Sequence, residues 1–216
     1  MVLPFSGEQL LANFALYNQA VWPAQVVLTA LAVWVAVGLR SGGRTAARRT
    51  DAVLAILWLW MAVAYHAAFF SAIIPAAWLF AGLFAGGAVV FAWSAVRPRP
   101  GGAAPSGPRA VAGWLLVAYA LLGYPAAALL VGHHYPAVPT FGLPCPTTIF
   151  TLGALLLSPA RRRLTFAIPL AWAAIGAVAA FRLGMPEDYG LAVAGLLALA
   201  FAGRRPPAPV ARRAVA

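Results

Sequence analysis

The sequence predicts an all-α integral membrane protein of seven transmembrane helices, with the N-terminus outside and the C-terminus inside the cell. Hydrophobic residues make up 63% of its 216 residues and charged residues only 9%. A soluble domain of this size needs a larger polar surface. All but one of the arginines fall into four short clusters, which long apolar stretches separate. Because basic residues favour the cytoplasmic side of a bilayer, the clusters predict both the number and the direction of the crossings.

The arginine clusters also explain the net charge of +11. They are Arg40/Arg44/Arg48/Arg49, Arg97/Arg99/Arg109, Arg161/Arg162/Arg163 and Arg204/Arg205/Arg212/Arg213. The segments predicted to lie outside carry Arg182 against Glu8, Glu187 and Asp188. A charge so unevenly placed indicates contact with anionic lipid headgroups at the inner face. We expect no nucleic-acid partner, since no basic groove on a folded surface is suggested.

The first half of the chain supplies three spans. A capping box at Ser6–Gln9 predicts a helix that either lies at the outer interface or forms the head of the first span. The first span follows Pro23, and Thr50 with Asp51 is expected to cap the second. Pro75 opens the third span, at a position where a helix tolerates proline. The predicted spans are 23–39, 51–73 and 75–96.

The second half supplies four more spans, after a basic inner loop between Arg97 and Arg109. The fourth contains Pro125, which predicts a kink. We expect one domain, 1–203, followed by a basic cytoplasmic tail, 204–216, that is disordered. The remaining spans are 110–132, 146–159, 164–183 and 187–203.

The fifth span is short. Fourteen residues from Pro146 to Pro159 rise about 21 Å, less than the ~30 Å of a hydrocarbon core. The preceding stretch Pro136–Pro146 holds too many prolines to be helical. It either dips into the outer leaflet, buried in protein, or forms a surface loop above a thinned bilayer.

An internal repeat is a further hypothesis. Phe70 precedes Pro75 by the same spacing as Phe181 precedes Pro186, in the two predicted outer turns. Pro23 and Pro146 each open a span from the outside. This pattern suggests a 3+1+3 parallel repeat, as in some sugar carriers.

Cysteine and lysine usage excludes several classes. A single cysteine, Cys145, allows no intrachain disulfide. The chain has no lysine, so neither retinal nor pyridoxal phosphate can bind as a Schiff base, and we predict no particular cofactor. The alanine- and arginine-rich composition suggests a bacterium and therefore its cytoplasmic membrane.

Polar residues within the predicted spans gather in the outer leaflet. Because polar groups in hydrocarbon need partners, this one-sided distribution predicts a shared pocket open to the outside. The candidate ligand-binding residues are Tyr65, His66, Tyr124, His133, His134, Tyr135, Cys145, Thr147, Thr148, Arg182 and Glu187.

Three of these residues suggest a metal site. His66 lies in the outer half of the second span, where it could bind a metal or haem iron, relay a proton, or only hydrogen-bond between helices. Cys145 begins the fifth span, where the positive helix end favours a reactive thiolate. With His66 or His133 it could bind a soft metal ion, although no recognised ligand spacing is present. Otherwise the thiol is an apolar filler.

Arg182 allows two interpretations. It is expected to form an ion pair with Glu187 or Asp188 at the outer face, and the alternative is that it binds an anionic ligand.

Several blocks carry a resemblance to a known family. They are LPFSGEQ…YNQAVWPAQ, WLWMAVAYHAAFFSAIIPAA, GHHYPAVPTFGLPCPTTIFTLG and MPEDYGLAVAG. Through them the chain resembles an uncharacterised family of bacterial multi-pass membrane proteins, domain of unknown function 6064. The resemblance implies a membrane protein but no activity. The motif positions it implies are His66, His133, Pro136, Cys145, Pro146, Thr147 and Thr148.

Three functions follow as hypotheses. The leading one is a non-enzymatic membrane protein that binds a small polar solute or metal ion in the outward-facing pocket, as a carrier. The alternatives are a haem- or thiol-based redox protein and a structural subunit of a membrane complex. An enzyme is less favoured than a protein without catalytic activity.

Overall fold

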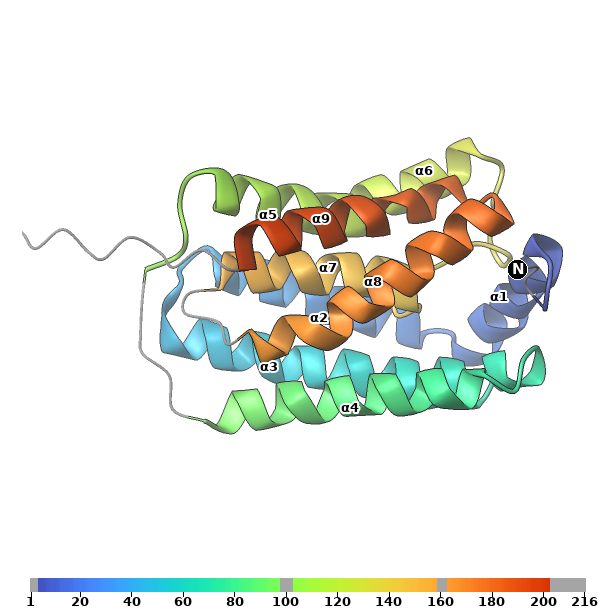
Figure 1. Ribbon diagram of the computed structural model, residues 1–216, viewed down its shortest axis with the longest axis horizontal. Helices are drawn as coiled ribbons and strands as arrows, with labels where there is room; N and C mark the ends of the chain where they lie inside the picture. Colours follow the sequence, from blue (N-terminus) through green and yellow to red (C-terminus); the bar gives the residue numbers. More distant parts are fainter. Residues whose placement is uncertain (1–3, 98–102, 159–162, 203–216) are drawn as a thin grey trace, which may run out of the picture.

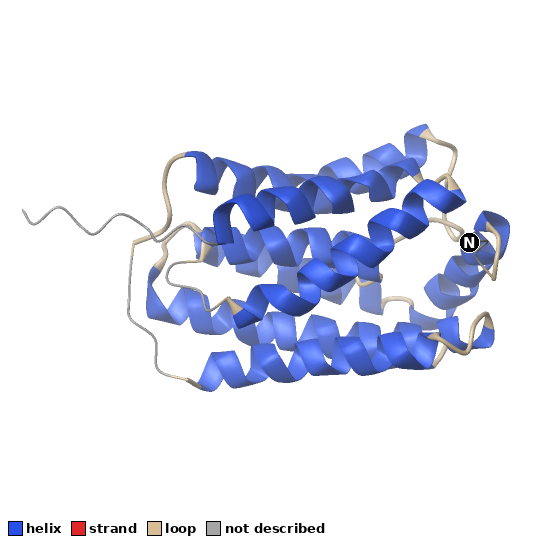
Figure 2. Cartoon of the chain, in the orientation of Figure 1, coloured by secondary structure: helices blue, strands red, loops and turns tan. Residues whose placement is uncertain are grey.

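The computed structural model describes residues 4–97, 103–158 and 163–202. The described residues form helices joined by turns, with no strand beyond one isolated bridge between Phe141 and Leu143 (Figure 2). The elements are α1 Gly7–Val21, α2 Ala24–Leu39, α3 Gly43–Trp60, η1 Met61–Ala67, η2 Phe70–Ala72, α4 Ala77–Val96, α5 Pro108–Ala118, η3 Tyr119–Gly123, α6 Tyr124–Leu130, α7 Pro144–Leu157, α8 Leu164–Leu183, η4 Pro186–Tyr189 and α9 Gly190–Ala202. The predicted tail, 204–216, lies outside the described residues.

The helices are long and apolar enough for a membrane protein. Four described segments have the length and hydropathy needed to cross a membrane: Gly43–Ala72, Ala77–Val96, Pro108–Leu130 and Leu164–Leu183. The pair α1–α2 gives a fifth if its two arms, bent by 88°, count as one span. The all-helical class predicted from composition is therefore confirmed with four to five candidate spans. The seven crossings, their direction and the repeat stay predictions.

The outer faces of the bundle are apolar. Leu79, Leu122 and Leu130 expose 76%, 72% and 88% of their surfaces. Large leucine side chains so exposed on many helices are unfavourable in water and favourable against lipid tails. The exposure pattern therefore agrees with the composition.

The first helix lies across one end of the bundle (Figure 1). The predicted capping box is confirmed, because the Ser6 Oγ accepts from the Gln9 N–H at 3.2 Å and the Gln9 Oε1 from the Ser6 N–H at 2.8 Å. Of the two interpretations of this helix, the structure shows a separate segment that turns sharply into α2. Its Phe14 and Tyr17 pack against Tyr65 of η1, which closes this end of the bundle.

The helix that holds the second span begins earlier than predicted. It starts at Gly43, so the expected cap at Thr50 and Asp51 is wrong. Both residues are buried inside α3. The Thr50 hydroxyl donates to the Ala46 carbonyl of its own helix at 2.9 Å, an alternative to capping that is open to any helical threonine.

Two of the long helices are interrupted by π-helical turns. One, η3, ends at Gly123, two residues before Pro125, where a kink is predicted. A proline has no N–H for the carbonyl one turn earlier, so the preceding turn widens. The other, η1, carries Tyr65 and His66. π-Turns within α-helices often occur at functional sites.

The short fifth helix, α7, is the centre of the bundle. It is buried from Pro146 to Ser158 and contacts α2, α3, α5, α8 and α9 (Figure 1). Trp58 of α3 donates its indole N–H to the Thr151 hydroxyl of α7 at 3.1 Å. Since protein surrounds α7, its length need not match the thickness of the lipid.

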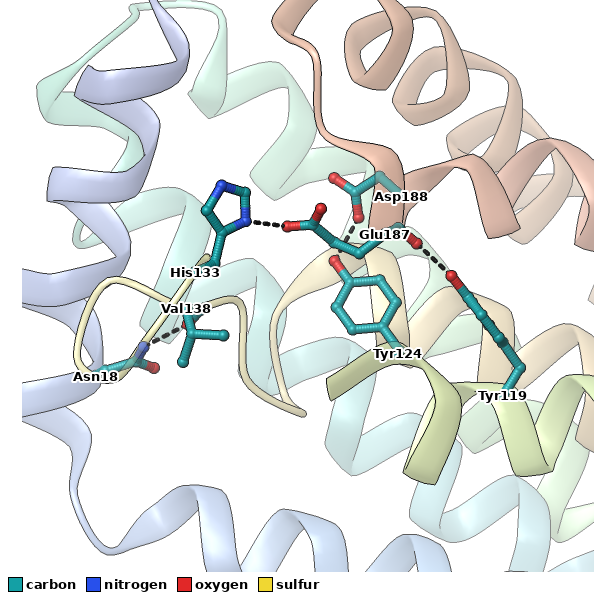
Figure 3. Close-up of polar contacts among 7 residues, drawn as sticks. All are labelled: Asn18, Tyr119, Tyr124, His133, Val138, Glu187 and Asp188. Carbon is teal, nitrogen blue, oxygen red and sulfur yellow. Dashed lines mark hydrogen bonds and ion pairs between the residues drawn. The ribbon is translucent and has the colours of Figure 1, made fainter. Parts of the chain in front are cut away.

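The irregular segment before α7 packs against the protein, half-buried at residues 136–138 and mostly buried from 139 to 143. Asn18 of α1 donates to the Val138 carbonyl at 2.7 Å (Figure 3). It also donates to the Pro136 carbonyl and accepts from the Thr140 hydroxyl, at 2.7 Å each. Gly142 is buried with a φ of 100°, and a Cβ there would lie 2.5 Å from Leu28. These contacts favour the buried segment over the surface loop, because the backbone finds protein partners.

Candidate functional site

A cluster of polar side chains lies at the end of the bundle that holds α1. The turns and helix ends with the described arginines of the first three clusters lie at the opposite end (Figure 1), and the fourth cluster lies outside the described residues. The cluster is formed by η4, the α5–η3–α6 helix, the loop before α7 and the start of α7.

The short helix η4 turns two neighbouring carboxylates inward. Pro186 begins it, and the Asp188 N–H donates to the Met185 carbonyl at 3.1 Å. As a result the side chains of Glu187 and Asp188 are buried, with 0% and 5% exposure. Buried acids need partners, and each finds different ones.

Asp188 contacts Tyr124 and Cys145. The Tyr124 hydroxyl of α6 donates to the Asp188 Oδ1 in a short hydrogen bond (Figure 3). The Cys145 thiol at the start of α7 also hydrogen-bonds to this carboxylate. Three elements that are distant in the sequence therefore meet at one carboxyl group.

Glu187 contacts the helix and loop on the other side. Its Oε1 lies 2.6 Å from the His133 Nδ1 (Figure 3). Its backbone carbonyl accepts from the Tyr119 hydroxyl of η3 at 2.7 Å. The second carboxylate oxygen, Oε2, is buried without a partner.

Burial controls the charge of Asp188, which lies in the turn between α8 and α9. Loss of solvent raises the pKa of Asp188 from 3.8 to about 7. The hydrogen bonds from Tyr124 and Cys145 oppose this shift, and the nearby Glu187 adds to it. Asp188 can therefore gain or lose a proton near neutral pH.

A cavity of about 320 Å³ lies beside Asp188. Its polar groups come from Asp188, Tyr65, Tyr124 and Cys145, and most of the rest of its wall is apolar. Its aromatic wall residues, besides the tyrosines, are Phe5, Phe14, Phe70, Phe80 and Trp172. A largely apolar cavity with a few convergent polar groups is typical of a small-molecule site.

A larger groove of about 740 Å³ lies between α2 and the α5–η3–α6 helix. It is open to the side, and no carboxylate or histidine lines it. We therefore place the candidate site at the smaller cavity, where the ionisable groups are.

His66 lies behind the aromatic wall rather than in the cavity. Its side chain is fully buried, and its ring centroid lies 4.5 Å from that of Phe84 and 5.2 Å from that of Trp172. Neither ring nitrogen has a hydrogen-bond partner, so the predicted bond between helices does not form in the structure. The Trp172 indole nitrogen is likewise buried without a partner.

The structure brings together some of the predicted residues and not others. Tyr65, Tyr124 and Cys145 line the cavity, and Glu187 and His133 pair next to it. The Thr147 hydroxyl binds backbone rather than the cavity, since it accepts a hydrogen bond from the Gly142 N–H at 3.1 Å. Thr148 is buried without a partner for its hydroxyl. The remaining candidates, His134, Tyr135 and Arg182, are exposed.

The residues that the sequence analysis missed are Asp188 and Trp172. The MPEDYG segment shows two adjacent acids, but the sequence does not show which of them faces a cavity. Only the turn of η4 distinguishes them. Trp172 lies midway along α8 and carries no local signal that separates it from other tryptophans.

The structure contradicts the expected ion pair of Arg182 and disfavours one of the two interpretations of Cys145. Within the described residues, Arg182 forms no ion pair with Glu187 or Asp188, because both acids turn inward while Arg182 is exposed. Cys145 faces the carboxylate of Asp188 rather than a free helix end. A second negative charge beside a carboxylate is unfavourable, which argues against the predicted reactive thiolate.

The metal hypothesis gains no support from the geometry. In the part of the chain that the structure describes, no group of three His, Cys, Asp or Glu residues could hold a metal ion. His133 pairs with Glu187, Cys145 with Asp188, and His66 is enclosed by aromatic rings.

The pairing of His133 with Glu187 gives a stability prediction. We expect His133→Ala to lower the free energy of unfolding by about 1–3 kcal/mol, because it leaves both oxygens of a buried carboxylate without a partner. The exposed neighbour gives the control, His134→Ala, which should change little. Thermal unfolding of both variants in detergent checks this, and an equal effect of the two would contradict it.

The described residues form an all-helical fold whose helices are apolar enough for a membrane protein, with buried carboxylates beside a largely apolar cavity. The sequence comparisons give its family. The chain belongs to the family of unknown function DUF6064, whose model matches residues 7–207. No curated protein and no solved structure matches the chain.

Proposed function

We propose that this protein crosses the bacterial cytoplasmic membrane seven times and binds a small solute in the cavity beside Asp188, which opens to the outside. The N-terminus is outside, the C-terminus inside, and the 3+1+3 repeat belongs to the same proposal. The protein would act as the binding component of a carrier. The observation that carries the proposal is a buried, titratable carboxyl group in the wall of a cavity.

The placement of arginines supports the direction. Arg40, Arg49, Arg97 and Arg109 lie at or near the turns of one end of the bundle, and Arg182 lies near the other end. A bilayer retains arginine on the cytoplasmic side, so the end with the cavity faces out.

The three shorter helices support both the crossings and the pocket. α2, α7 and α9 run alongside the longer helices (Figure 1). Each begins at the cavity end, after α1, the irregular loop and η4 respectively. Non-helical backbone at membrane depth is tolerated where it is buried in protein or lines a wet cavity. The short helices therefore leave room for a site at this end.

Burial of the Glu187 and Asp188 carboxyl groups costs free energy. Ionisable residues inside a membrane protein are costly, and those retained usually serve binding or proton transfer. Asp188 is the polar group of the cavity that can carry a full charge near neutral pH.

The single cysteine tests this proposal without further engineering. In sealed right-side-out vesicles, a membrane-impermeant methanethiosulfonate should modify Cys145, and in inside-out vesicles it should not. Cys145→Ser gives the background. Modification from the inner side only, or from neither side while denatured protein reacts fully, would refute an outward-facing pocket.

A further inference from the structure

The chemistry of the cavity wall limits the class of ligand. Its charge-bearing group is Asp188, and Glu187 lies next to it in the sequence. An anion would be repelled by both carboxylates. A sugar needs many hydrogen-bonding partners, whereas most of this wall is apolar. A bare metal ion would need several ligands, and the described residues offer no group of three.

The aromatic wall favours a cation with an apolar body. Phe70, Phe80 and Trp172 line the cavity together with Tyr65. The rings of Phe80 and Trp172 are 5.4 Å apart and nearly perpendicular, at 76°. Aromatic rings offer a large apolar contact area to the body of such a ligand, while its charge is left for Asp188.

The carboxylate retains capacity for such a ligand. An ionised carboxyl group accepts about four hydrogen bonds. Asp188 receives one from Tyr124 and one from Cys145, which leaves acceptor positions for an ammonium group.

We propose that the cavity binds an organic ammonium ion, with the charged nitrogen at Asp188 and the apolar body between Phe70, Phe80 and Trp172. This inference rests on the proposed function and names the ligand class of the same site.

Binding should displace a proton from Asp188. The titratable groups that interact electrostatically with it are Tyr124, Cys145, Glu187, His133, Tyr65 and Tyr119. Because a pKa of about 7 leaves Asp188 partly protonated at neutral pH, a bound cation shifts it to the carboxylate and the proton passes to solvent. Below that pH, affinity should fall about tenfold per pH unit.

The test uses the full chain in lipid nanodiscs and the rate of Cys145 modification. The probes are methanethiosulfonates bearing trimethylammonium, sulfonate or hydroxyl groups. The rate of each probe with Cys145 is divided by the rate of the same probe with a small free thiol. We expect the cationic probe to react at least about tenfold faster than the anionic one, with the neutral probe between them. In Asp188→Asn the preference should vanish, and in Glu8→Gln, which alters an exposed acid, it should persist.

Protection by a reversible ligand gives a second measurement. Benzyltrimethylammonium should slow the neutral probe, and neopentylbenzene, its uncharged isostere, should not at the same concentration. Phe80→Leu should weaken the protection while the protein remains folded, which keeps the test valid if Asp188→Asn fails to fold. Lowering the pH below 7 should also weaken the protection by benzyltrimethylammonium.

The outcomes separate the two proposals. If Cys145 reacts from the outside but shows no preference for the cationic probe, or if the isostere protects equally, the ligand is not a cation and the outward-facing pocket stands. If Cys145 is not accessible from the outside in vesicles, the pocket itself is refuted.

Discussion

Gly153→Ala should destabilise the protein by about 1–3 kcal/mol, because α5 and α7 approach each other through backbone at this position. A Cβ on Gly153 would lie 2.8 Å from the Gly113 carbonyl oxygen and 3.0 Å from the Val117 nitrogen. Backbone atoms of a packed helix cannot move aside as a flexible side chain can. Since α7 is the centre of the bundle, the displacement would spread to the neighbouring helices.

The control for this prediction is another helical glycine. A Cβ on Gly82 of α4 would meet no atom within 4 Å, so Gly82→Ala should be neutral or slightly stabilising through its higher helix propensity. Thermal or denaturant unfolding in detergent micelles measures both. Equal stability of the two variants would show that α5 and α7 are not in close contact at Gly153.

Asp188→Asn should remove most of the pH dependence of stability between about pH 4 and pH 7. Folding raises the pKa of Asp188 from 3.8 to about 7, mainly through burial. In this window the folded protein keeps a proton that the unfolded chain releases, so stability falls as pH rises and the loss is complete above about pH 7. At about 1.4 kcal/mol per pH unit, the loss of stability over this shift is at most about 4–5 kcal/mol.

Asparagine resembles the protonated acid in shape and carries no charge. The variant should therefore be more stable than the native protein at about pH 8, with the difference shrinking toward pH 5. Unfolding midpoints across this range measure the effect. Glu8→Gln alters an exposed acid and should leave the native profile unchanged. A native profile that is flat, or that rises with pH in the same window, would refute the raised pKa.

Local signals predicted local structure well. Ser6 and Gln9 form their capping box because both partners lie within one helical turn. Pro125 follows a widened turn because its missing N–H acts on the residues just before it. The predicted helix start at Thr50 was wrong, since a threonine hydroxyl can hydrogen-bond within its own helix as well as cap a helix.

The candidate site was predicted only in part, for a related reason. Tyr65, Tyr124 and Cys145 were chosen because polar groups in a membrane helix tend to face protein, and all three line the cavity. Arg182 was assigned to Glu187 or Asp188 from proximity in sequence, whereas the side chains of the two acids bind residues more than forty positions away. Proximity along the chain does not show which way a turn points its side chains.

By itself the sequence determined the helical class and the apolar character of the helices, because periodicity, caps and hydropathy act through neighbouring residues. Tertiary structure alone decided that α7 is central, that Asp188 rather than Glu187 borders the cavity, and that His66 lies behind Phe80 and Trp172. The physical reason is that helix packing joins residues far apart in the chain, and each contact depends on the shapes of both partners.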